Sequence, residues 1–211
     1  HGLLDLVDRP QWYVVQGGSD QYVKVIRERL KDLRLGSAVR AVTREKTRVL
    51  VTVGATVEAF DEVVFACHSG QALAVLTDAS SAERDVLGAM RFSGNEVVLH
   101  QDASVMPVRP EVWASWNYHA PLGATQASLT YYMNRLQSFA SNQPVLVTLN
   151  DAGTIDENLV LKRLHYEHPV FDVAMLAAQG RHAEISGVGR THYCGAYWRY
   201  GFHEDGVVSG L

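Results

Sequence analysis

The hydrophobic positions of this chain change their spacing several times, and each change predicts an element. After the glycine pair Gly17-Gly18, apolar residues recur at helical spacing up to Gly36, which predicts a helix with Ser19 as its N-cap. Between residues 38 and 66, short apolar and β-branched runs alternate with polar turns. This pattern predicts four strands, at Val39–Thr43, Val49–Val53, Thr56–Phe60 and Val63–Ala66.

The middle of the chain predicts short helices followed by a sheet. Gln71–Leu76 has a helical pattern, and Ser80 and Glu83 have the spacing of a capping box at the start of a second helix. Short turns between strands are typical of antiparallel pairing, so we expect an α+β fold with a mixed, largely antiparallel sheet and flanking helices. The strands are expected at Glu96–Gln101, Val112–Tyr118, Ala127–Asn134, Val145–Leu149 and Leu159–Tyr166.

The C-terminal stretch carries the strongest chemical signal. Thr191–Cys194 predicts a strand, a turn rich in glycine and aromatic residues follows, and Glu204-Asp205-Gly206 opens a helix. The first N–H groups of a helix are unpaired and lie at the positive end of its dipole. This arrangement favours a phosphate or a heterocycle that becomes negative on reduction. A packed glycine turn without a ligand is the alternative interpretation.

Composition narrows the class of protein. The chain has 211 residues, of which 47% are hydrophobic and 20% charged, as expected for a globular protein of one or two domains. The net charge of −4 has no long runs of one sign, which argues against a nucleic-acid partner. No transmembrane segment and no targeting segment are visible, so a cytoplasmic location is the default expectation.

The C-terminal residues resemble a known motif. Cys194–Trp198, then Gly201–Gly206, then Ser209-Gly210, look like the C-terminal FAD-binding motif of the flavin-containing amine oxidase and phytoene-desaturase superfamily. The pattern is most similar to the bacterial predicted NAD/FAD-binding proteins. The resemblance implies an FAD-dependent oxidoreductase acting on a small-molecule substrate. The cofactor-binding positions that it implies are Gly17, Gly18, Val39, Gly195, Ala196, Glu204, Asp205 and Gly206, and the residues expected near the flavin ring in catalytic roles are Tyr197, Trp198 and His203.

Further stretches extend the resemblance over nearly the whole chain. Asp61–Cys67 resembles the family's strand that returns the chain to the dinucleotide-binding sheet, and the tyrosine- and tryptophan-rich runs resemble its substrate-binding domain. His68 follows that strand and is expected either to face the cofactor or to be an ordinary hydrogen-bonding residue. The resemblance divides the chain into a second FAD-contacting segment (1–90), a substrate-binding domain (91–185) and a C-terminal strand, turn and helix (186–211).

The sequence departs from this family in one respect. It contains no Gly-x-Gly-x-x-Gly fingerprint, so we expect a portion of a longer flavoprotein that lacks the N-terminal dinucleotide-binding unit. A non-catalytic α+β module that binds a ligand or partner without holding FAD is the alternative. The lysine of amine oxidases has no clear counterpart, since Lys162 lies in a different context. Desaturation or isomerisation of a lipid-like substrate therefore stays open, as does a homo-oligomeric state.

Other chemistries lack their motifs. Nine histidines are present, but neither His-Glu-x-x-His nor His-x-x-Glu-His occurs, and His165 and His168 on a strand would point to opposite faces. We therefore predict no metal site. Two cysteines, Cys67 and Cys194, are too few for a disulfide framework, and no Gly-x-Ser-x-Gly elbow indicates a serine hydrolase.

Overall fold

The computed structural model describes residues 7, 13–120, 127–138, 140–151 and 153–211. The chain divides into two compact units, residues 1–36 and residues 37–211, and each is described by itself. The first unit contains helix α1 (Asp20–Arg29), which begins after Ser19 as predicted, although the Ser19 side chain makes no capping hydrogen bond. None of the residues of α1 is buried, so its apolar positions pack against no core within the unit.

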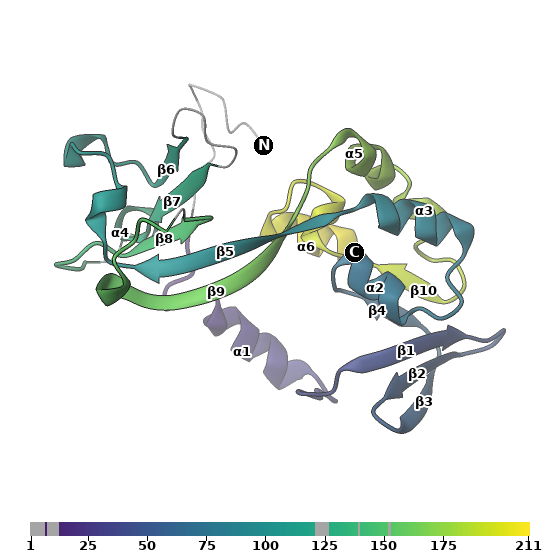
Figure 1. The fold of residues 1–211 in the computed structure, drawn as a ribbon. Coiled ribbons are helices and arrows are strands. Elements are labelled where there is room, and N and C mark those ends of the chain that lie inside the picture. Colours follow the sequence, from purple (N-terminus) through teal and green to yellow (C-terminus); the bar gives the residue numbers. More distant parts are fainter. Residues whose placement is uncertain (1–6, 8–12, 121–126, 139, 152) are drawn as a thin grey trace. The chain divides into compact units, whose positions relative to one another are not determined.

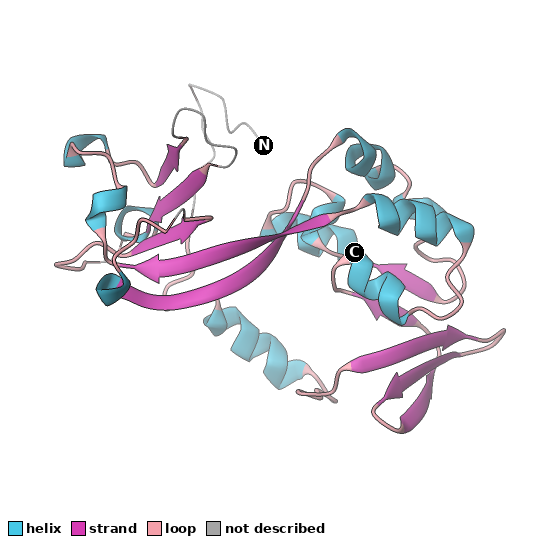
Figure 2. Cartoon of the chain, in the orientation of Figure 1, coloured by secondary structure: helices cyan, strands magenta, loops and turns pink. Residues whose placement is uncertain are grey.

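The second unit contains three sheets (Figures 1 and 2). Strands β1 (Val39–Arg44), β2 (Val49–Val53) and β3 (Thr56–Phe60) form an antiparallel sheet, and all three strands were predicted from their β-branched runs. Strands β4 (Val63–Phe65) and β10 (Thr191–Tyr193) form a parallel pair. The fold is α+β, as the sequence predicts.

The third sheet is antiparallel throughout and has the order β6-β7-β8-β5-β9. Its two longest strands, β5 and β9, run side by side and lead away from the other three strands toward the helices (Figure 1). The five strands are β5 (Phe92–His100), β6 (Trp116–His119), β7 (Ser128–Tyr132), β8 (Leu146–Leu149) and β9 (Val160–Pro169).

Two predicted strands are wrong at one end. Val112–Tyr118 was expected to be extended throughout, but Pro110–Val112 is a 3-10 turn and β6 begins only at Trp116. Proline fixes the backbone for such a turn, and the Trp113 indole N–H then donates a 2.8 Å hydrogen bond to the Pro107 carbonyl. Likewise, the expected strand Ala127–Asn134 ends at Tyr132, where a helical turn begins.

The helices of the second unit are α2 (Ser69–Val75), α3 (Ser81–Ala89), α4 (Met133–Leu136), α5 (Val173–Gln179) and α6 (His203–Gly210). The capping box is present at α3, where Ser80 Oγ accepts from the Glu83 N–H and the Glu83 carboxylate accepts from the Ser80 N–H. A hydrophobic core forms where α2, α3 and α5 meet β1, β2, β4 and β10; its largest fully buried members are Tyr193, Leu87, Met90 and Met175.

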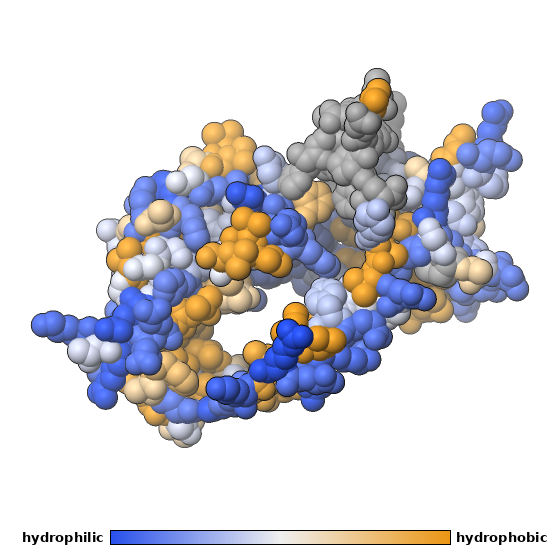
Figure 3. Space-filling view, turned by 180° about the vertical axis from the view of Figure 1, so that it is seen from behind, coloured by the Kyte–Doolittle hydropathy of each residue, from blue (hydrophilic) through white to orange (hydrophobic). Residues whose placement is uncertain are grey.

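The surface mixes polar and apolar side chains. In the space-filling view, hydrophobic residues form several small patches among hydrophilic ones (Figure 3). Among the described residues, no helix has both the length and the apolar content that a membrane crossing requires.

Candidate functional site: the turn pocket

Strands β4 and β10 bring two distant loops to one edge. They are parallel, with Tyr193 opposite Phe65, and the Cys194 N–H donates a 2.9 Å hydrogen bond to the Phe65 carbonyl. Because parallel strands have their carboxyl ends at the same edge, the segments that follow them, 66–68 and 194–197, meet there. In open α/β sheets, the crevice outside the carboxyl ends of the strands is the usual place for a ligand.

The chain leaves β10 through Gly195 and one 3-10 turn, Ala196–Trp198. A Cβ atom on Gly195 would lie 2.5 Å from Cε1 of Tyr197. No real Cβ tolerates such a contact, so a larger residue would displace the tyrosine ring. Glycine at this position is therefore a steric requirement of the turn.

Helix α6 packs closely on this turn. Ser209 Oγ accepts a 2.9 Å hydrogen bond from the Gly195 N–H and also lies 2.8 Å from the Gly206 carbonyl oxygen, to which it donates. A Cβ atom on Gly206 would be 3.7 Å from the Ala196 nitrogen, so the helix presents its small residues to the turn. These contacts fix the last helix against the backbone of residues 195 and 196.

A cavity of about 250 Å³ opens beside the turn, and we call it the turn pocket. It is formed by the end of β4, the start of β5, the end of β9 and the turn after β10. Its lining residues are Ala66, Cys67, His68, Phe92, Glu167, Pro169, Gly195, Ala196, Tyr197 and Gly201. The pairing of β5 with β9, which sets Phe92 opposite Pro169, brings the middle of the chain to this edge.

Two buried polar atoms at the turn have no hydrogen-bond partner in the described part of the chain, Tyr197 Oη and Trp198 Nε1. Both side chains are 5% exposed; Tyr197 lines the turn pocket, whereas Trp198 lies in the core. Burial raises the pKa of Tyr197, and the nearby Trp198 indole only partly opposes this shift, so the phenol is a neutral donor at pH 7. An unpaired buried polar group costs about 1–3 kcal/mol, which a ligand accepting from Tyr197 would partly recover.

His68 is held on the wall of the turn pocket by two contacts. Its ring stacks on Phe92 with the centroids 4.0 Å apart and the planes 15° from parallel. Its Nδ1 lies 3.2 Å from Oε2 of Glu167, a residue of β9. Phe92 in turn contacts Tyr197 edge-on, with centroids 5.6 Å apart, so three rings line one side of the pocket.

Only some of the predicted site residues lie at the turn pocket. Gly195, Ala196 and Tyr197 line the turn pocket, and Gly206 packs directly behind them. Trp198 is buried in the core beside Tyr197. The remaining predicted residues of this unit do not line the turn pocket. His203 and Glu204 are exposed on the first turn of α6, and Asp205 is buried there, where its carboxylate accepts a 2.9 Å hydrogen bond from the Phe202 N–H. Val39 is 40% exposed at the start of β1.

Gly17 and Gly18 lie in the first unit, where both have positive φ angles, 81° and 87°, ahead of α1. These are backbone conformations that glycine adopts without strain. The Gly18 N–H donates a 2.9 Å hydrogen bond to the Val15 carbonyl, which closes a turn before the helix. Both the turn and α1 belong to the first unit.

Sequence reasoning did not assign Phe92 and Glu167 to the site. Neither residue carries a local signal, because Phe92 lies ahead of the strand that the sequence predicts at Glu96–Gln101, and Glu167 lies in a polar run. Phe92 and Glu167 are 75 positions apart in the sequence. The antiparallel pairing of β5 with β9 brings both of them to the turn pocket. For His68 the available signal was its position directly after the predicted strand segment Asp61–Cys67; β4 itself ends at Phe65.

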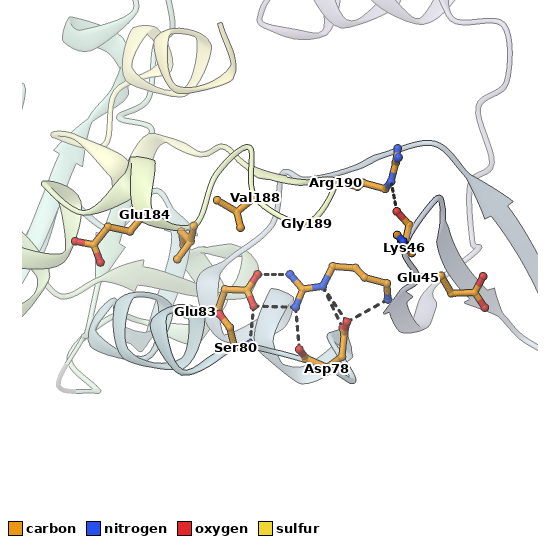
Figure 4. A pocket seen from close by; sticks show the side chains of 11 residues that line it. Glu45, Lys46, Asp78, Ser80, Glu83, Glu184, Val188, Gly189 and Arg190 are labelled. Atoms are coloured by element: carbon orange, nitrogen blue, oxygen red, sulfur yellow. Dashed lines mark hydrogen bonds and ion pairs between the residues drawn. The ribbon is translucent and has the colours of Figure 1, made fainter.

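A second polar cluster stabilises the same unit (Figure 4). The Arg44 guanidinium contacts Glu83 Oε1 at 2.5 Å and Asp78 Oδ2 at 3.0 Å, and Glu83 also accepts from the Tyr193 phenol at 2.7 Å. Burial raises the pKa of Tyr193, and so does Glu83, which keeps this phenol a donor. The charges of Arg44 and Glu83 compensate each other, so we interpret this cluster as structural: it connects β1, α3 and β10.

The five-stranded sheet encloses a buried polar chain. Fully buried His100 contacts Thr148 Oγ1 through Nε2 at 2.7 Å, and Thr148 contacts Thr130 Oγ1 at 2.8 Å. Burial is the main cause that lowers the pKa of His100, and its Nδ1 accepts the Asp102 N–H. Thr148 also lines a separate cavity of about 500 Å³ in this sheet. Among the described residues, no group of three or more His, Cys, Asp or Glu side chains has the arrangement of a metal site.

No model of a known protein family matches the sequence, and no curated protein is significantly similar to it. Solved structures do match. A fatty acid isomerase from P. acnes, which produces CLA, has a TM-score of 0.59 at 14% identity, over 91% of this chain and 50% of that one. A putrescine oxidase with bound putrescine has a TM-score of 0.57 at 14% identity, over 91% and 50%. Cyclohexylamine oxidase from Brevibacterium oxydans IH-35A has a TM-score of 0.52 at 10% identity, over 83% and 46%.

These matches define the fold class. The chain has the fold of one half of flavin amine oxidase-like structures, and it spans about half the length of the structures that it matches. At such low identity the match concerns the fold and not the reaction, and the matched proteins themselves include an isomerase and oxidases.

Proposed function

We propose that this chain is the part of an FAD-dependent, amine oxidase-like oxidoreductase that holds the flavin half of the cofactor at the turn pocket. One observation carries the proposal: a glycine turn at the carboxyl ends of two parallel strands adjoins a cavity lined by Tyr197, whose buried hydroxyl has no hydrogen-bond partner among the described residues. The resemblance of residues 194–210 to an FAD-binding motif and the shared fold of half a flavoenzyme support the same assignment.

The residues of the turn pocket fit part of FAD. A typical small-molecule pocket has about 300–1,000 Å³, so a cavity of about 250 Å³ accommodates one end of a dinucleotide and not the whole of it. The sequence contains no Gly-x-Gly-x-x-Gly, the motif that holds a pyrophosphate on a helix N-terminus. We therefore expect residues outside this chain to complete the cofactor site in the active enzyme.

Bound FAD would supply the acceptor for a hydride equivalent that leaves a small organic substrate. The backbone of Gly195 and Ala196 would approach the ribityl chain and pyrophosphate, with Tyr197 donating a hydrogen bond from the pocket wall. The start of α6, at Glu204, Asp205 and Gly206, would favour negative charge on the reduced ring by about 0.3–1 kcal/mol.

Three further residues have proposed roles. Trp198 would support Tyr197 from the core, and His203 would exchange a proton with solvent at the helix start. Gly17 and Gly18 of the first unit would serve as cofactor-binding residues. In the second unit, the backbone of Val39 at the start of β1 would approach the adenine. The substrate is a small molecule, and either an amine or a lipid-like compound suits a pocket whose walls are mostly apolar.

Titration with FAD, followed by quenching of flavin fluorescence, tests the proposal. Ala66 is exposed at the pocket wall, so Ala66→Leu fills the cavity without altering the core. The control is Ala74→Leu, since Ala74 is exposed on α2 and does not line the pocket. We expect FAD to bind the unaltered chain and Ala74→Leu equally, and Ala66→Leu at least about tenfold more weakly, a loss of about 1.4 kcal/mol.

The alternative function is a non-catalytic α+β binding module. Equal affinity of all three proteins for FAD would place the cofactor elsewhere, and absence of binding at millimolar FAD would favour the module. An intact mass and a visible spectrum of the purified protein add an independent readout, because a retained flavin absorbs where the protein does not.

A further inference from the structure

The wall of the turn pocket contains a histidine paired with a carboxylate. His68 Nδ1 and Glu167 Oε2 are 3.2 Å apart, and the ring of His68 is stacked on Phe92. The backbone of His68 is fixed as well, since its N–H donates to Gln71 Oε1 at 3.2 Å. In the described part of the chain, the second ring nitrogen, Nε2, has no hydrogen-bond partner. The contact at Nδ1 thus orients the imidazole, while Nε2 is available to accept a proton.

We propose that His68 is the proton acceptor of the turn pocket and that Glu167 is the positioning residue that orients it. This inference rests on the proposed function, because it assigns a role in the reaction at the same pocket. A carboxylate that accepts the Nδ1 proton leaves the lone pair on Nε2, which is the form that a general base needs. The ring stack on Phe92 holds the imidazole against rotation.

The other titratable groups of the turn pocket do not serve this purpose. Burial raises the pKa of the Cys67 thiol, and it raises the pKa of the Tyr197 phenol, so both keep their protons near neutral pH. Cys194 follows β10 and does not line the pocket, and burial likewise raises the pKa of its thiol. His68, by contrast, lines the pocket with a ring nitrogen, Nε2, that has no hydrogen-bond partner in the described part of the chain.

The step suits a substrate in which a carbon bears an amine or a hydroxyl. FAD, if bound as proposed, would supply the acceptor for a hydride equivalent from that carbon, and the oxidised substrate would be an iminium or a protonated carbonyl. The N–H or O–H bond then breaks, its electron pair stays on the heteroatom to complete the imine or carbonyl, and the proton forms a bond with His68 Nε2. Glu167 compensates the positive charge on the imidazolium until the proton passes to water.

Histidine NMR tests the pair through a signal that does not depend on turnover. In protein labelled with ¹⁵N-histidine, long-range correlations show which ring nitrogen carries the proton. We expect His68 to be protonated at Nδ1 at pH 8, to switch to Nε2 in Glu167→Ala, and to keep the Nδ1 proton in Glu167→Gln, which retains an acceptor. Glu167 is exposed on β9, so both variants are expected to fold, which circular dichroism checks.

The chain offers a matched control in a second histidine and glutamate pair. His192 Nε2 lies 2.9 Å from Glu62 Oε2, and neither residue lines the turn pocket. Glu62→Ala should change the His192 signals and leave His68 unaltered. Added FAD should shift the His68 signals at the concentrations that quench flavin fluorescence, with no shift at His192.

The outcomes separate the two proposals. If FAD binds but His68 carries its proton on Nε2, or does not respond to FAD, the proton-acceptor role is overturned and the proposed function stands. If FAD does not bind at all, the proposed function is overturned and the role of His68 with it. Binding together with the Nδ1 proton, its loss in Glu167→Ala and its retention in Glu167→Gln supports both.

Discussion

The Tyr193 phenol donates a 2.7 Å hydrogen bond to Glu83 Oε1 and thereby joins the last strand of the chain to helix α3. Tyr193 has no exposed surface, and its ring stacks on Phe65 with centroids 5.5 Å apart. The turn pocket begins two residues after Tyr193, at Gly195. The position of the glycine turn therefore depends on this buried bond as well as on the parallel pairing of β4 and β10.

Loss of that hydrogen bond should destabilise the fold. Tyr193→Phe keeps the ring and removes the donor, and hydrogen bonds to charged groups contribute about 1.5–3 kcal/mol. We expect the free energy of unfolding, measured with urea, to fall by that amount. Tyr166→Phe, at a residue that is 51% exposed, serves as the control and should change it by less than about 0.5 kcal/mol. Equal effects of the two substitutions would contradict the structural role of the bond.

Stability should also fall with acid because of Glu83. Burial alone would raise the pKa of this carboxyl, but hydrogen bonds from Arg44, Ser80 and Tyr193 outweigh it and lower the pKa from 4.5 to about 2. A group with a lowered pKa in the folded state contributes its full stability above pH 4.5, and loses it as the pH falls toward 2. The contribution is on the order of 3 kcal/mol.

Urea unfolding of the unaltered chain and of Glu83→Gln, at pH 7 and again at pH 3, measures this contribution. At pH 7 the variant should be less stable by about 3–5 kcal/mol, because it leaves part of a buried ion pair uncompensated. At pH 3 the difference should be clearly smaller, since this carboxyl is already protonated in the unfolded form of the unaltered chain, where its pKa is 4.5, while it stays mostly ionised in the folded form. A difference that stays constant with pH would mean that other carboxylates cause the acid sensitivity.

Much of the local structure could be predicted from the sequence. The capping box of Ser80 and Glu83, the strands from Val39 to Phe65 and the strand before Gly195 all have patterns that depend on near neighbours. The failures, at Trp113 and after Tyr132, occurred where a proline or a change of chain direction ended the extended pattern early. The contact of Glu167 with His68 could not be predicted, because it depends on the register of β5 with β9, and alternation along a strand does not determine that register.

The turn itself gives a steric prediction. Gly195→Ala would place a Cβ atom 2.5 Å from the Tyr197 ring, which must then move within a buried environment. Overpacking of this kind costs about 1–3 kcal/mol, so we expect the urea midpoint to fall. The near-ultraviolet circular dichroism of the aromatic residues should change at the same time, because Tyr197 contacts both Phe92 and Trp198.

Gly88→Ala separates this effect from the general effect of replacing glycine. Gly88 is exposed within α3, and a Cβ atom there has no heavy atom within 4 Å, so alanine should stabilise that helix by about 0.5–1 kcal/mol. The two substitutions add the same methyl group and should shift stability in opposite directions. If Gly195→Ala instead left both stability and the aromatic signal unaltered, Tyr197 would have room to move, and the turn pocket would lack the fixed wall on which the proposed cofactor contact depends.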